Sequence, residues 1–191
     1  MLLIVATGFA KPKYIFYFIG DGMGPSHVLA TELYLGELQG VIGRPQKLVF
    51  TQFPESAFVT TFSASNGVTD SAASGTALST GSKTSNGRIG KDAEGNDVPT
   101  ILDHAKEYGK ATGVVTTDAM NGATPASFSG HAMDRNDTLT ILNTQLVSDV
   151  DLLCANATSE AKAMESFAKQ AGYSYCDNFN SIGETKESEK A

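Results

Sequence analysis

Three short stretches of the chain contain residues whose types could carry out chemistry on an anion. The first is TDSAASGT, residues 69–76, in which Ser71 follows an aspartate and precedes small residues. A serine hydroxyl is a weak nucleophile until a base or a metal ion draws off its proton. At the start of a helix, unpaired backbone N–H groups and the helix dipole also favour a bound anion such as phosphate. Ser71 is therefore either a nucleophile or, with Asp70, the cap of a helix.

The second stretch is FIGDGMG, residues 18–24, which places the carboxylate of Asp21 between two glycines after an apolar run. A dinucleotide-binding loop would need a third glycine where Pro25 stands, and the lysine of a phosphate-binding P-loop is missing. A carboxylate is a good ligand for a hard cation, and flanking glycines let the ligand approach. Asp21 is a candidate metal ligand, and the alternative is an aspartate in a turn.

The third stretch is NGATPASFSGHAMDR, residues 121–135. Thr124 precedes a proline at a predicted helix start, so its hydroxyl could cap the helix or bind a cation. Arg135 offers a planar fork of donors that suits the oxygens of a phosphate. A capping threonine and a surface arginine are the alternatives. A metal ion bound by residues such as Asp21 would stabilise a serine alkoxide without a neighbouring histidine.

The elements expected to position these residues alternate between strands and helices. The predicted strands are 14–20, 57–64, 110–118 and 173–176; the predicted helices are 26–38, 70–81, 100–109, one starting at 124, 138–147 and 159–172. Such alternation predicts an α/β fold with a largely parallel central sheet and helices on both faces. Ligands of such sheets bind at the carboxyl ends of strands, and each of the three stretches follows a predicted strand.

Taken together, the stretches YFIGDGMG, VTDSAASGTALSTGSKTSNGRIG and GVVTTDAMNGATPASFSGHAMDR resemble the alkaline phosphatase family in order and spacing. They cover most of residues 14–135. The resemblance implies a metal-dependent hydrolase of small phosphate monoesters that uses Zn²⁺ and Mg²⁺, forms a phosphoserine intermediate, and is often a homodimer.

The resemblance also implies roles for individual residues. Ser71 would be the nucleophile that becomes phosphorylated. Asp21 would bridge a zinc and the magnesium, and Thr124 would bind the magnesium. Arg135 would bind the phosphoryl oxygens, with Asp70 orienting it.

The sequence departs from the family in two respects. Gly122 stands where the family has an aspartate or histidine near the magnesium, and no histidine follows His131. Asp21 and Thr124 alone cannot ligate two adjacent metals. We therefore expect residues 11–191 to be the N-terminal part of an incomplete phosphatase-like domain that lacks the family's C-terminal zinc ligands.

Two other functions remain open at this stage. The chain could be a non-catalytic fragment that binds magnesium or phosphate weakly, or that needs a complementing chain. It could also be a relative that acts on phosphate diesters or sulfate esters, which the match of the Ser71 stretch and Arg135 to the monoesterase pattern disfavours.

Composition limits the partners and the cellular location. The net charge of −7 argues against nucleic acid and anionic membranes as partners, and no apolar run is long enough to span a bilayer. Residues 1–10 resemble the end of a secretory signal, with a buried strand as the alternative, which favours a periplasmic or secreted protein. Cys154 and Cys176 could form a disulfide there or remain free thiols.

Overall fold

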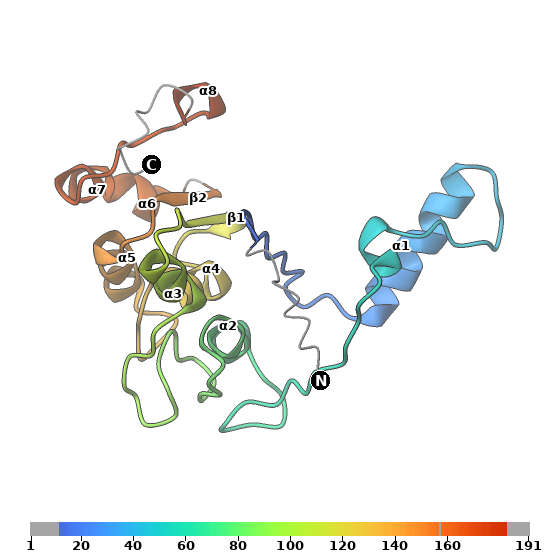
Figure 1. The fold of residues 1–191 in the computed structure, drawn as a ribbon, viewed down its shortest axis with the longest axis horizontal. Helices are drawn as coiled ribbons and strands as arrows, with labels where there is room; N and C mark the ends of the chain where they lie inside the picture. Colours follow the sequence, from blue (N-terminus) through green and yellow to red (C-terminus); the bar gives the residue numbers. More distant parts are fainter. Residues whose placement is uncertain (1–11, 157, 183–191) are drawn as a thin grey trace, which may run out of the picture. The chain divides into compact units, whose positions relative to one another are not determined.

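The computed structural model describes residues 12–156 and 158–182, in two compact units that divide after Pro54 (Figure 1). Each unit is described by itself. Residues 1–10, where the sequence predicts a signal remnant, lie outside the described residues. In the described part of the chain, none of the helices combines the length and hydropathy that a membrane-spanning segment requires.

The second unit contains a small parallel sheet. Strand β1 (Gly113–Ala119) pairs with β2 (Leu152–Asn156), with Gly113 opposite Leu152 and Val115 opposite Cys154. The predicted α/β class and the parallel pairing are thus confirmed. The prediction of β1 over 110–118 is also confirmed to within a few residues, whereas β2 was not predicted.

Seven helices of the second unit fall within the described residues. They are α2 (Ser71–Thr80), α3 (Ile101–Glu107), α4 (Ala123–Ser129), α5 (Thr138–Val147), α6 (Ser159–Ala163), α7 (Glu165–Gln170) and α8 (Phe179–Ile182). Helix α2 packs against α4, α4 contacts both β1 and α5, and Figure 1 shows this succession from α2 to the two strands. Small apolar side chains and two isoleucines fill the core: Ala72, Ile89, Ala123, Ala126, Ala132 and Ile141.

Helix α2 has strong signals at both ends. The carboxylate of Asp70 caps its start by accepting a hydrogen bond from the backbone N–H of Ala73 at 2.9 Å. Gly81 ends it in the left-handed conformation, with φ of +76°, which glycine adopts without steric cost. The predicted helix over 70–81 is confirmed. It could be predicted because both end signals act within one helical turn.

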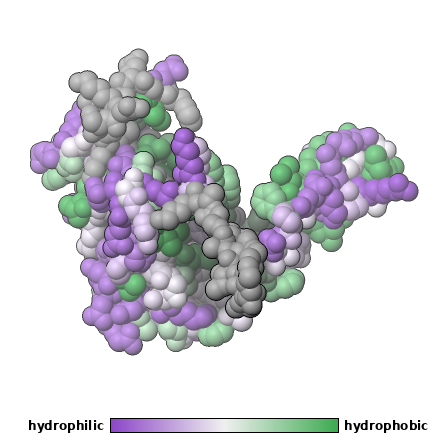
Figure 2. All heavy atoms as spheres, viewed as in Figure 1, coloured by the Kyte–Doolittle hydropathy of each residue, from purple (hydrophilic) through white to green (hydrophobic). Residues whose placement is uncertain are grey.

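The first unit is organised around one buried carboxylate. Glu32 lies on α1 (Pro25–Leu38) and accepts hydrogen bonds from Lys47 Nζ, the Leu48 backbone N–H and Thr51 Oγ1 at 2.7 to 3.0 Å. These bonds, that from Thr51 foremost, lower the pKa of Glu32 from 4.5 to about 2. No apolar side chain is buried among residues 12–54, and Figure 2 shows apolar groups at this unit's surface.

Three of the predicted strands are absent from the described structure. Residues 14–20, 57–64 and 173–176 form no ladder with another strand, and several of the aromatic side chains that suggested strands are exposed, Phe58 fully so. A strand exists only through a partner that supplies hydrogen bonds, and apolar character alone cannot supply one. The predicted helix over 159–172 is also divided at Met164 into α6 and α7.

Candidate active site

The two oxygens of Asp70 connect the start of α2 with a distant part of the second unit. Oδ1 caps the helix through Ala73. Oδ2 accepts one hydrogen bond from the backbone N–H of Gly87 at 2.9 Å and another from Arg135 Nη1 at 3.1 Å. Because the second partner is a guanidinium, this contact is also an ion pair between residues 65 positions apart.

Backbone pairing holds Arg135 in this place independently of its side chain. Its own N–H donates to the carbonyl of Gly87 at 2.7 Å. Two residues further along that loop, Ile89 and Ala132 exchange backbone hydrogen bonds in an antiparallel bridge. The hydroxyl of Thr76 on α2 accepts from the N–H of Gly90 and so fixes the loop to the helix. These hydrogen bonds fix the backbone of Arg135 beside α2, and its guanidinium extends from that fixed position.

Ser71 is the first residue of α2 and is half-buried. Behind it, Ala72 and Ala73 are buried in the core, so the helix start has a packed support. The guanidinium of Arg135 makes a single hydrogen bond among the described residues, that to Asp70, and its side chain is 37% exposed. A hydroxyl, the positive end of a helix and an arginine with further donors thus gather at one edge, a combination that suits a phosphate.

Thr124 is the second residue of α4 and lies against α2. The contact is close because Gly75 has no side chain: a Cβ there would lie 2.9 Å from Ser127 Oγ and 3.6 Å from the Cα of Thr124. Hydrogen bonds also join the helices, since Ser79 Oγ donates to the Ser127 carbonyl at 2.6 Å. Helix α4 begins at Ala123, so the proline expected at its first position is at its third.

Asp118 is a residue that the sequence analysis did not single out. It lies near the end of β1, and its Oδ2 occupies the space that a side chain at Gly122 would need. Its Oδ1 accepts from the N–H of Ala119 at 2.7 Å. Gly122, two residues before Thr124, thus has no side chain of its own, but the carboxylate of Asp118 lies beside it. The signal available in the sequence was an acidic residue four positions before the unusual glycine.

Asp21 belongs to the first unit, whereas Asp70, Ser71, Thr124 and Arg135 belong to the second. It is exposed in a turn in which the Gly20 carbonyl accepts from the N–H of Met23. The expected strand before it is irregular, and α1 follows it. The structure therefore brings together four of the five predicted site residues.

The donor groups of the described residues do not fit a zinc site. Within residues 12–156 and 158–182, no group of three or more histidine, cysteine, aspartate or glutamate side chains could hold a metal ion. His27 accepts from the Gly24 N–H at the start of α1, and His104 pairs with a glutamate at the surface. His131 Nδ1 lies 2.6 Å from the carbonyl of Gly90. These histidines have structural roles.

Comparison with known proteins gives a consistent result. The family model described as alkaline phosphatase matches residues 12–153. Alkaline phosphatase 4 of Drosophila melanogaster is 40% identical over 134 residues, which are 66% of this chain and 22% of that protein. Alkaline phosphatase 3 of Bacillus subtilis is 34% identical over an alignment that covers 93% of this chain and 40% of its own length.

Solved structures agree. The cold-active alkaline phosphatase of a psychrophilic Shewanella species superposes with a TM-score of 0.70 at 31% identity, over 87% of this chain and 42% of that enzyme. The alkaline phosphatase of the Antarctic bacterium TAB5 gives 0.63 at 31% identity, over 74% and 43%. A mutant of the TAB5 enzyme is described with Mg bound in its M3 site. The chain thus spans less than half the length of each of these relatives.

Proposed function

Since this chain belongs to the alkaline phosphatase family, we propose that it carries the nucleophile and the phosphate-binding arginine of a phosphate monoester hydrolase. The observation that best supports the proposal is the shared carboxylate of Asp70. It starts the helix on which Ser71 is the first residue, and it orients the guanidinium of Arg135. One side chain thereby sets the positions of two groups that phosphoryl transfer requires.

In the proposed reaction, Arg135 and the first backbone N–H groups of α2 bind the phosphoryl oxygens. Ser71 Oγ forms a bond to phosphorus as the ester oxygen leaves, and the serine proton ends on the released alcohol. Water then cleaves the phosphoserine, which returns the serine hydroxyl and releases inorganic phosphate. Positioning and charge neutralisation supply most of the catalysis in such transfers.

We propose zinc and magnesium as cofactors of the whole protein and not of the described residues alone. We propose Asp21 and Thr124 as two of the metal ligands, with Asp118 as a carboxylate near Thr124. The remaining ligands would come from residues other than those described, because these contain no group of side chains able to hold a zinc ion.

A substitution at Ser71 tests the proposal. In the full-length protein supplied with zinc and magnesium, Ser71→Ala should lower turnover of a chromogenic phosphate monoester by roughly a thousandfold or more. Ser74→Ala is the matched control, since the Ser74 hydroxyl donates to backbone carbonyls of the same helix turn, those of Asp70 at 2.8 Å and Ser71 at 3.5 Å. Acid quenching and mass spectrometry should find the phosphate on Ser71. Turnover that survives Ser71→Ala would show that another group attacks.

The second candidate is a non-catalytic phosphate- or magnesium-binding chain, which the lack of a zinc cluster in the described residues favours. Zinc stoichiometry on the purified 191-residue chain separates the two. Two tightly held zinc ions and metal-dependent turnover by this chain alone would eliminate the non-catalytic function. Phosphate binding that Arg135→Lys weakens, without turnover or bound zinc, would support it.

A further inference from the structure

The dipeptide Asn–Gly occurs three times in the chain, at Asn66–Gly67, Asn86–Gly87 and Asn121–Gly122. In this dipeptide the backbone nitrogen of the glycine can attack the side-chain amide of the asparagine, because glycine has no side chain that would hinder the approach. The three pairs share this local chemistry. They differ in the hydrogen bonds that the fold gives to the attacking nitrogen and to the amide.

The Asn66–Gly67 pair lies in an exposed loop shortly before α2. The N–H of Gly67 and the side-chain nitrogen of Asn66 have no hydrogen-bond acceptor among the described residues. A Cβ placed on Gly67 would meet no atom within 4 Å beyond its chain neighbours, so the space around the pair is open. Asn66 Oδ1 accepts from the N–H of Val68 at 3.0 Å, and a donor at this place stabilises the negative charge that develops on the oxygen during attack.

Asn86 is exposed like Asn66, but the nitrogen that would attack it is already bound. The N–H of Gly87 donates to Asp70 Oδ2 at 2.9 Å. The side-chain nitrogen of Asn86 donates to the Val68 carbonyl at 3.0 Å, which holds the amide in place. The Gly87 hydrogen bond must open before this pair can react.

The Asn121–Gly122 pair is protected in the same way at the start of α4. The N–H of Gly122 donates to the Ala119 carbonyl at 2.9 Å, and Asn121 Nδ2 donates to Thr138 Oγ1 at 3.2 Å. Asn121 is also half-buried, and Gly122 is the N-cap of the helix. Exposure alone would make two of the three pairs reactive, whereas the hydrogen bonds leave one.

We propose that Asn66 is a site of spontaneous chemical modification and that the fold protects Asn86 and Asn121 from the same reaction. The nitrogen of Gly67 loses its proton and bonds to Cγ of Asn66, while the bond from Cγ to the amide nitrogen breaks and ammonia leaves. The product is a five-membered succinimide ring. Water then opens the ring at one of its two carbonyls and leaves either aspartate or isoaspartate at position 66.

The isoaspartate product changes the backbone beside Asn86. Ser65 Oγ accepts from the N–H of Asn86 at 3.0 Å, and the Val68 carbonyl accepts from its side chain. Isoaspartate lengthens the main chain by one methylene between these two contacts, so both cannot keep their present geometry. Because Asn86 precedes Gly87, whose N–H binds Asp70, the modification loosens the loop beside the start of α2.

Incubation of the folded 191-residue chain at mildly alkaline pH, in water enriched in oxygen-18, tests the proposal. Each new carboxylate takes one oxygen from this water, so its mass distinguishes it from deamidation during later handling. Trypsin separates the three pairs, because cleavage after lysine and arginine gives peptides 48–83, 84–88 and 111–135. We expect Asn66 to react about tenfold faster than Asn86 or Asn121, since each of these pairs must first lose a hydrogen bond. Equal rates in the folded chain would overturn the proposal.

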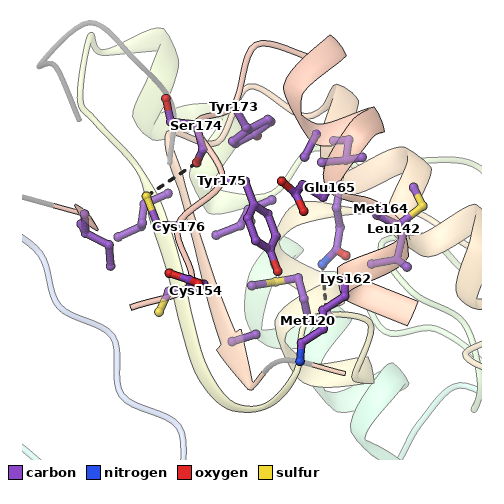
Figure 3. Close-up of a pocket in the computed structure, with 18 of the residues that line it drawn as sticks. Met120, Leu142, Cys154, Lys162, Met164, Glu165, Tyr173, Ser174, Tyr175 and Cys176 are labelled. Carbon is purple, nitrogen blue, oxygen red and sulfur yellow. Dashed lines mark hydrogen bonds between the residues drawn. The ribbon is translucent and has the colours of Figure 1, made fainter. Parts of the chain in front are cut away.

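The same incubation in urea is the matched control, because glycine follows the asparagine in all three pairs. Unfolding should bring the three rates together, and an Asn66 that stays fastest in urea would show that the neighbouring sequence, not the fold, sets the order. A reducing agent keeps Cys154 and Cys176 as free thiols; Figure 3 shows both on one side of a cavity in the second unit. None of these measurements depends on phosphatase activity.

Removing the acceptor of the Gly87 N–H tests the protection directly. Asp70→Ala should raise the rate at Asn86 about fivefold and leave Asn121 unchanged, so that Asn121 reports whether the fold remains intact. An unchanged rate at Asn86 would contradict protection by this hydrogen bond. Modified chain, separated by its additional negative charge, should contain a fraction in which the Gly87 amide hydrogen exchanges faster than in the parent chain. Unchanged exchange would overturn the link between the two loops.

Discussion

The first unit has a charged residue at its centre, whereas the second has an apolar cluster. Glu32 holds α1 against residues 47–51 through three hydrogen bonds, and no apolar side chain is buried around it in the described residues 12–54. In the second unit, buried small residues bring α2 and α4 together, and polar contacts such as that between Asp70 and Arg135 are added at the edge. The packed core of the second unit therefore gives a firmer support than the first unit for a side chain that must be held in one position, such as Ser71.

The largest expected effect comes from breaking the close contact in the second unit. Gly75→Leu would force a side chain into Ser127 and separate α2 from α4, so we expect a loss of about 3 kcal/mol in the free energy of unfolding. Gly67→Leu is the control, since no atom lies near that position. Urea unfolding followed by circular dichroism measures both, and equal losses would show that the contact is not limiting.

A smaller effect is expected at the polar edge of the same unit. Asp70→Asn keeps the helix cap but turns an amide N–H₂ toward two donors, the Gly87 N–H and Arg135, at a cost of about 1 kcal/mol at this partly exposed position. Asp137→Asn is the matched control, because Asp137 caps α5 without an arginine partner. The same urea titration should detect a smaller loss for Asp137→Asn, because its second oxygen accepts from the Thr140 hydroxyl, which can turn and accept from an amide. Identical results for the two variants would argue that the ion pair contributes nothing.

The smallest effect on the whole chain is expected at Glu32, since it is confined to the first unit. Its pKa is lowered from 4.5 to about 2, so its contribution to stability is complete above about pH 4.5 and is lost as the pH falls toward 2. The Leu48 amide resonance in NMR should report this transition. Glu32→Gln should abolish this transition. The exposed neighbour Glu37 supplies the control, Glu37→Gln, in which the transition should persist.

Local signals in the sequence predicted the helices better than the sheet. The ends of α2 follow from Asp70 and Gly81, which act within one turn. By contrast, β2 contains Leu, Cys, Ala and Asn with no β-branched residue, so its composition gave no strand signal. The aromatic run 14–20 gave a strong strand signal and has no strand partner among the described residues, because pairing depends on other segments.

The candidate site was predictable only in part. Residue types and positions made Ser71, Asp21, Thr124 and Arg135 candidates, but their grouping into one site came from the resemblance. A contact across 65 residues, such as that of Asp70 with Arg135, leaves no local pattern. Asp118 was missed for a related reason. The sequence shows that Gly122 lacks a side chain, but only the backbone geometry at the end of β1 shows which neighbour fills the space.

The two oxygens of Asp70 bind partners at very different distances along the chain, and this difference affects the order in which the chain folds. Oδ1 accepts from the N–H of Ala73, three residues away, whereas Oδ2 accepts from the guanidinium of Arg135, 65 residues further along. During synthesis the helix start that bears Ser71 can form long before Arg135 leaves the ribosome, since short-range contacts close faster than long-range ones. This edge of the second unit is thus assembled in the order of the chain, and Arg135 is the last residue to join it.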